Sequence, residues 1–163
     1  MMHFSIGADK LLNVPNAGGS SVLSEVLSFE LLHKCFRASL LKTEMEVEYF
    51  PEGGSITDYV CDVFGQKVGV SVTRAMKYRG QYTRHDALHL LNKKLTGVIQ
   101  SSRNTLEGWS KQILHVWTPS SRISNTVTKV YKKLPCAVRH NTVVVVTTTD
   151  KSEFMFNNQM KPP

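Results

Sequence analysis

The sequence predicts an α/β fold in which a mixed central sheet is flanked by helices. Three observations carry this prediction: three consecutive strand-like segments, an alternation of helical and strand-like patterns after them, and a final β-branched run. The predicted order is α-β-β-β-α-β-α-β. With 163 residues the chain is long enough for a substantial core, and we predict a single domain over residues 1–163.

The first half of the chain predicts a lead-in, one helix and one strand. Residues 1–19 are interrupted by proline and glycine and predict a strand or loop. Residues 22–36 follow two serines that can cap a helix, and they are apolar around most of a helical circumference, so this helix is expected to be mostly buried. In residues 43–49 glutamates alternate strictly with apolar residues, which predicts a half-buried strand.

Two further strands are predicted at residues 55–64 and 67–73, with a tight turn at Gly65-Gln66 between them. On the second of these strands, Val68, Val70 and Val72 point to one face and the residues between them to the other. The pair therefore predicts a β-hairpin.

The second half alternates helix and strand. A helix begins near Thr83, where Thr83 and Asp86 have the spacing of a capping box, and a strand follows at 112–117. The next helix begins after Pro119 and ends at Pro135, and residues 141–148 predict a strand that is central and buried on both faces. We expect the core to span residues 20–148 and the tail, 149–163, to be loose.

Charge is distributed unevenly along the chain. The formal net charge is +7, yet residues 1–65 hold four basic and nine acidic side chains, whereas residues 66–139 hold fourteen basic and two acidic ones. A basic segment of this size favours a polyanionic partner, DNA or RNA being the usual one. A protein partner or a homodimer stays open.

Composition excludes several classes of protein. The hydrophobic fraction of 41% is too high for a wholly disordered chain, and no apolar run approaches the length of a membrane span. No secretory signal is visible, and the three cysteines fit neither a disulfide framework nor a zinc site. We therefore predict an intracellular protein of the nucleus or cytoplasm that is not secreted and not bound to a membrane.

Two carboxylates occupy unusual positions. Asp58 shares a predicted strand face with Ile56 and Val60, and Glu25 lies in a helix that is otherwise nearly all apolar. A buried carboxylate costs several kcal/mol unless it is paired or bound to metal. Alternatively, Asp58 bonds to a nearby backbone group and Glu25 benefits from the helix dipole.

The order of these features resembles the restriction-endonuclease-like, PD-(D/E)XK, nuclease superfamily over residues 20–148. That family has a helix, a three-strand meander, a helix and a strand, with an acid in the helix, an Asp on the second strand and a Glu/Asp-x-Lys triplet on the third. The resemblance implies that Glu25 and Asp58 are the catalytic acids and ligands of Mg²⁺, and it places Ser71 and Thr73 at the positions of the second acid and the lysine.

Serine and threonine bring no charge to a metal site, so the third-strand motif is degenerate. The family relocates its acid or lysine in some members, and the residues of this sequence that offer such a replacement are Asp62, Arg74, Lys77, Lys93 and Lys94. The resemblance thus implies a pseudo-nuclease that keeps nucleic-acid binding and has weakened or lost metal-dependent phosphodiester cleavage. It needs no cofactor if inactive, and Mg²⁺ if active.

Nucleic-acid contacts are predicted from basic residues interleaved with tyrosine after the third strand of the meander. Such a mixture suits phosphate contacts together with base stacking. The predicted contact residues are Arg74, Lys77, Tyr78, Arg79, Arg84, Lys93 and Lys94.

Two alternatives remain open at this point. One is an active Mg²⁺-dependent nuclease with a rearranged catalytic triplet. The other is a scaffold or subunit without enzymatic activity, whose basic surface binds an acidic protein. A fold-level resemblance does not choose among these functions.

Overall fold

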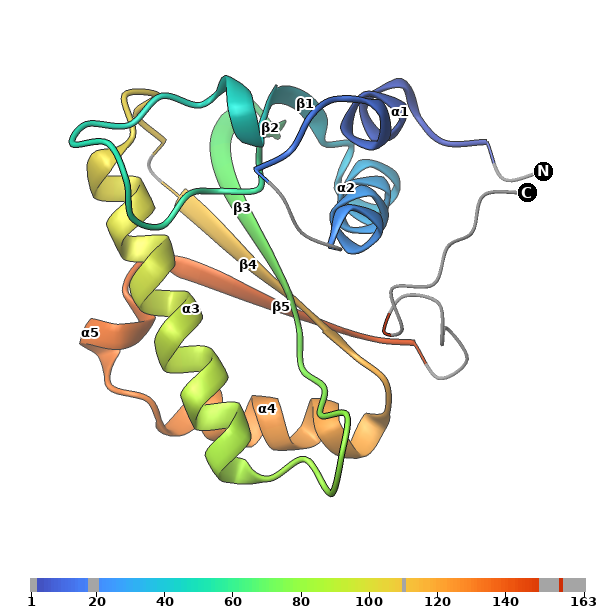
Figure 1. Cartoon of the computed structure of the whole chain (residues 1–163), viewed down its shortest axis with the longest axis vertical. Helices are drawn as coiled ribbons and strands as arrows, with labels where there is room; N and C mark the ends of the chain where they lie inside the picture. Colours follow the sequence, from blue (N-terminus) through green and yellow to red (C-terminus); the bar gives the residue numbers. More distant parts are fainter. Residues whose placement is uncertain (1–2, 18–20, 110, 150–155, 157–163) are drawn as a thin grey trace.

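The computed structural model describes residues 3–17, 21–109, 111–149 and 156 (Figure 1). Within them one five-stranded mixed sheet is formed in the order β1-β2-β3-β4-β5. The first three strands pair antiparallel, and β3, β4 and β5 pair parallel. The strands are β1 Ser39–Thr43, β2 Tyr59–Val63, β3 Gln66–Arg74, β4 Lys111–Thr118 and β5 Thr142–Thr148.

Helices cover both faces of the sheet, so the predicted fold class is confirmed. Helices α1 and α2 lie on one side, and α3, α4 and α5 lie on the other (Figure 1). The predicted order of principal elements is also observed, with α1 and the short α5 in addition. The helices are α1 Ile6–Asn13, α2 Val22–Phe36, α3 Arg84–Asn104, α4 Ser121–Lys133 and α5 Cys136–Arg139.

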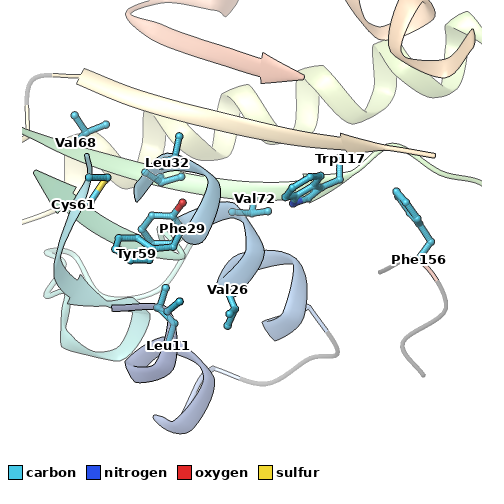
Figure 2. Packing of buried hydrophobic residues seen from close by; sticks show 13 residues of the cluster. Leu11, Val26, Phe29, Leu32, Tyr59, Cys61, Val68, Val72, Trp117 and Phe156 are labelled. Carbon is cyan, nitrogen blue, oxygen red and sulfur yellow. The ribbon is translucent and has the colours of Figure 1, made fainter. Parts of the chain in front are cut away.

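The first core lies between α2 and the sheet (Figure 2). Val26, Phe29 and Leu32 of α2 are buried against the valines that alternate along β3, as predicted from the period of two. Phe156, the one described residue after Thr149, belongs to the same cluster and is buried. Because burial of this many apolar side chains stabilises the α2–sheet contact, α2 is held firmly over β3.

The second core lies under α3 and α4. Leu91, Leu95 and Val98 of α3 recur at helical spacing, and they are buried together with Val127 of α4. Leu88, one turn before Leu91, is instead 41% exposed. Thr83 caps α3, and the predicted capping box with Asp86 is present. The face of α3 that does not pack on this core is open to solvent.

The strand predicted at residues 43–49 was wrong. The strand ends at Thr43, and Glu44–Glu46 form a short 3-10 helix, η1. Glu46 accepts a hydrogen bond from the Thr43 backbone over 2.8 Å and forms an ion pair with Lys10. Capping and pairing of this glutamate stabilise a helical turn, which the alternating pattern does not reveal. Met45 is accordingly 60% exposed.

Two other positions also differ from the prediction. The lead-in at residues 1–19 contains helix α1, whose N-cap Ser5 accepts a hydrogen bond from Ala8 N–H. The final strand, β5, is an edge strand that pairs only with β4 in the described sheet, and its Val143 is 54% exposed. A β-branched run indicates a strand, but it does not fix the place of that strand in the sheet. The loose tail lies outside the described residues, apart from Thr149 and Phe156.

No helix in the described ranges has the length and apolarity that crossing a membrane requires.

Replacement of Gly69 by alanine is expected to destabilise the sheet by about 1–3 kcal/mol, because overpacking displaces fixed neighbours. A Cβ at Gly69 would lie 2.7 Å from Trp109 Cε2, and the Trp109 indole N–H donates to Ser102 Oγ over 2.7 Å, which holds the ring in place. Urea unfolding measures the loss. In a Trp109→Leu background the same substitution should cost much less, and an equal cost in both backgrounds would contradict the proposed clash.

Candidate functional site

The candidate site lies at the open edge of β3, where β2 begins. Tyr59 is the first residue of β2 and pairs with Val70. Beyond this pair β3 continues to Arg74, so the Val72 N–H has no partner in β2. The Asp58 carboxylate takes that place, because Val72 N–H donates to Asp58 Oδ2 over 2.5 Å. Asp58 is thus fixed beside the strand that carries Ser71 and Thr73.

Glu25 approaches the same edge from helix α2. It lies in the first turn of α2 and is 8% exposed. Ser21 Oγ donates to Glu25 Oε1 over 2.6 Å. The packing of α2 on β3 through Phe29 and Leu32 determines the position of this helical turn.

The charge of Glu25 acts on the Asp58 carboxylate. Burial and then the negative charge of Glu25 raise the pKa of Asp58 from 3.8 to about 7. Burial is also the main cause that raises the pKa of Glu25, and Ser21 and nearby cations counteract it. A pair of carboxylates with like charge in a poorly solvated place is therefore the central electrostatic feature of the site.

Lys94 is the basic residue whose charge acts on both carboxylates. It lowers the pKa of Asp58 and that of Glu25, whereas Arg74 lowers that of Glu25. Lys94 is half-buried on α3, and it lines a cavity of about 340 Å³ together with Asp58, Ser71 and Lys93. The cleft thus combines an acid from the sheet edge with lysines from the facing helix.

The remaining predicted residues are distributed around this cleft. Ser71 lines it and is 9% exposed, and Thr73 is on the same face of β3 with the same exposure. Asp62, one of the candidates for a relocated acid, accepts a hydrogen bond from Gly65 N–H at the hairpin turn, at the far end of β3 from Arg74. Of the replacement candidates, the structure brings Lys93 and Lys94 into the cleft with Asp58.

Apart from Lys94, which lines the cleft with Asp58, the predicted nucleic-acid contacts divide into three groups. Arg74 and Lys93 line a cavity of about 450 Å³ beside the cleft, and Lys93 lines both. Lys77 forms an ion pair with Asp86 at 3.2 Å, while Tyr78 and Arg79 are exposed in the same loop. Arg84 contributes to a separate basic cleft with α4, together with Lys129, Lys132 and Lys133.

A row of residues along the exposed face of α3 contains the predicted contact Lys93 together with three residues that were not predicted as part of the site: His85, His89 and Gly97. His85 and His89 line the 450 Å³ cavity and a third cavity of about 550 Å³, which Lys93 also lines. Gly97 lines the third cavity and also the 340 Å³ cleft that contains Asp58, which we call the carboxylate cleft. The spacing of four residues from His85 through His89 and Lys93 to Gly97 is the sequence signal that places them in one row.

The fold and the site define a mixed α/β domain with a carboxylate pair and a lysine at the open edge of its sheet. No family model matches the chain. The chain is 46% identical over 160 residues to the AAC-rich mRNA clone AAC4 protein of Dictyostelium discoideum, with 93% of this chain and 24% of that protein covered. The chain therefore spans about a quarter of the length of that relative.

One solved structure that is similar to the chain is that of SfsA from Pyrococcus furiosus in complex with Ca²⁺. The TM-score is 0.41 and the sequence identity 14%, with 83% of this chain and 68% of that chain covered. The fold class of this chain rests on its own sheet topology.

Proposed function

We propose that this chain is a nucleic-acid-binding domain of the restriction-endonuclease-like kind, in which metal-dependent phosphodiester cleavage is weakened or lost. The observation that carries the proposal is the cleft at the open edge of β3 in which Asp58 and Lys94 lie together, with the charge of Glu25 acting on Asp58. They supply two of the three acids in the family pattern together with a lysine. The lysine comes from α3 in place of Thr73, and Ser71 leaves the third acid missing.

The carboxylate pair fits a divalent cation such as Mg²⁺. Mg²⁺ prefers oxygen ligands and is usually held by one or two carboxylates together with waters and phosphate oxygens. In the described part of the chain no group of three His, Cys, Asp or Glu side chains offers a complete metal site. Glu25 and Asp58 would therefore hold the cation with phosphate of the substrate, and bound Mg²⁺ would supply Lewis-acid stabilisation of the developing charge.

The same pair gives a reason for weak cleavage. The carboxylates must be deprotonated to bind a cation, and Asp58, whose pKa is about 7, is substantially protonated at neutral pH. Ser71, at the position of the second sheet acid, lines the cleft without contributing charge. Both facts favour weaker metal binding than a site with three carboxylates would have.

Binding of the phosphate backbone does not depend on the carboxylates. Lys93, Arg74 and the lysines of the α4 cleft supply positive charge on the α3 side of the sheet. Neutralisation of phosphates by such residues releases counterions and gives sequence-independent affinity that falls with salt. A domain with this surface is expected to bind nucleic acid even where cleavage is lost.

The test combines binding and cleavage on labelled single- and double-stranded DNA and RNA, with Mg²⁺, Mn²⁺ or chelator. We expect binding that weakens steeply with salt, and cleavage that is slow or absent in Mg²⁺. Any cleavage should disappear in the Asp58→Asn and Lys94→Met variants, while binding in chelator persists. Asp62→Asn is the matched control, because Asp62 lies at the hairpin turn.

Other outcomes would overturn the proposal. Fast metal-dependent cleavage that Asp58→Asn abolishes would favour the active nuclease with a rearranged triplet. Absence of binding to any nucleic acid at low salt would leave the scaffold that binds an acidic protein.

A further inference from the structure

The 450 Å³ cavity between α3 and the loop at residues 75–83 has a composition unlike that of a simple phosphate contact. Its volume lies within the range of pockets that enclose small organic ligands. Met76, Leu90 and Tyr82 give it apolar walls, and Arg74 and Lys93 give it positive charge. A pocket that joins apolar walls to cationic groups suits a ligand with both an aromatic ring and a phosphate.

The polar groups of the cavity favour a ligand that is negatively charged and can form hydrogen bonds. Its one acid, Asp86, already accepts hydrogen bonds from the Thr83 backbone and from Thr83 Oγ1, and it pairs with Lys77. His85 and His89 are exposed on the α3 side of the cavity. The Tyr82 hydroxyl is buried and has no hydrogen-bond partner among the described residues, which is uncommon for a buried polar group.

An exposed aromatic side chain lies in the same loop. Tyr78 is 75% exposed and stands between Lys77 and Arg79, four residues before Tyr82. Exposed aromatic side chains beside cations are the stacking platforms of proteins that bind single strands, because every base offers a π-face. In a duplex the bases are stacked and paired, so neither a pocket nor such a platform can reach them without unstacking.

We propose that this cavity binds one nucleotide of a single-stranded nucleic acid, and that Tyr78 stacks on a neighbouring base. The inference rests on the proposed function and deepens it by naming the substrate class. The base lies against Met76 and Leu90, and the phosphate lies toward Arg74 and Lys93. Because Lys93 also lines the carboxylate cleft, a strand held in the cavity continues toward Asp58.

The experiment measures the affinity of the chain in chelator for a short single strand, for the duplex of the same sequence and for inorganic polyphosphate, by fluorescence anisotropy and competition. The variants are Tyr78→Ala and His89→Ala. Phe64→Ala matches Tyr78 because Phe64 is also 75% exposed and lies at the opposite end of β3, and His140→Ala is the control for His89.

We expect tighter binding of the single strand than of the duplex. Tyr78→Ala should weaken single-strand binding about tenfold, the size of one lost stacking contact, and leave polyphosphate binding unchanged. His89→Ala should weaken single-strand binding as well, whereas both controls should leave it unchanged. A nucleoside monophosphate should compete better than inorganic phosphate.

Equal or tighter binding of the duplex would overturn the inference, as would equal losses on the single strand and on polyphosphate. Nucleic-acid binding that is insensitive to both variants would overturn the inference alone and leave the proposed function standing. Failure to bind any nucleic acid would instead remove the proposed function.

Discussion

Asp58→Asn is expected to raise the free energy of unfolding by about 2–4 kcal/mol at pH 8, in chelator. In the folded chain the pKa of Asp58 is about 7, compared with an ordinary value of 3.8. Burial and the charge of Glu25 therefore make the ionised carboxylate unfavourable. Asparagine removes that charge and keeps an oxygen that accepts from Val72 N–H.

The raised pKa of Asp58 determines how the stabilising effect of Asp58→Asn changes with pH. Between about pH 4 and pH 7 the folded chain binds a proton at Asp58 that the unfolded chain has released, so the contribution of Asp58 to stability falls as pH rises through this window. The gain from Asp58→Asn should therefore be largest above pH 7 and should vanish near pH 4. Urea unfolding of both proteins across this range measures it.

Mg²⁺ provides the complementary measurement. A cation that binds the folded chain raises its thermal midpoint, and the rise grows with pH because deprotonated carboxylates are required. We expect this rise in the parent chain and in the Asp62→Asn control, and not in Asp58→Asn. If Asp58→Asn destabilised the chain at pH 8 in chelator, the carboxylate pair would not be a strained site kept for function.

The fold was largely predictable because its signals are local. The valines of β3 alternate with a period of two, and the leucines of α3 recur at helical spacing, so each element presents one apolar face to a core. The strand predicted at residues 43–49 failed because an ion pair between Lys10 and Glu46, distant in sequence, favours another local structure. The edge position of β5 likewise depends on which strands pair, and that is a tertiary property.

The site was predictable only in part. Glu25 and Asp58 were notable in the sequence as acids among apolar residues, and in the structure the charge of Glu25 raises the pKa of Asp58. The choice of Lys94 among the basic candidates depends on the direction in which α3 crosses the end of β3, which spacing alone does not define. The histidines of α3 were visible as a pair four residues apart, but their cavity is formed with the loop at residues 75–83.

A buried histidine holds the helix that carries Glu25. His115 of β4 is fully buried, and its Nδ1 and Ser28 Oγ are 2.7 Å apart. Ser28 Oγ also lies 2.8 Å from the Tyr59 hydroxyl, and His115 Nε2 lies 2.9 Å from Thr147 Oγ1. These hydrogen bonds connect α2 to β2, β4 and β5 inside the first core.

Protonation of His115 is expected to destabilise the folded chain in acid. Burial lowers the pKa of His115 from 6.5 to about 4. Between these values the unfolded chain binds a proton that the folded chain does not, so stability is lost as pH falls from about 6.5 to 4. The loss from this one residue should reach about 3 kcal/mol at pH 4 and below.

His115→Asn separates this titration from the other acid effects. Asparagine retains a polar group near Ser28 but does not titrate, so we expect lower stability at pH 7. The loss of stability between pH 6.5 and 4 should be smaller than in the parent chain by about 3 kcal/mol. His140→Ala, which removes an exposed histidine, should leave the slope as it is in the parent chain. A slope unchanged in His115→Asn would show that the buried imidazole does not limit stability in acid.

The hydrogen bonds that link His115 to Ser28 position the first turns of α2, which carry Glu25. The variant His115→Asn should therefore also weaken the Mg²⁺-dependent rise in thermal midpoint, without altering single-strand binding in chelator.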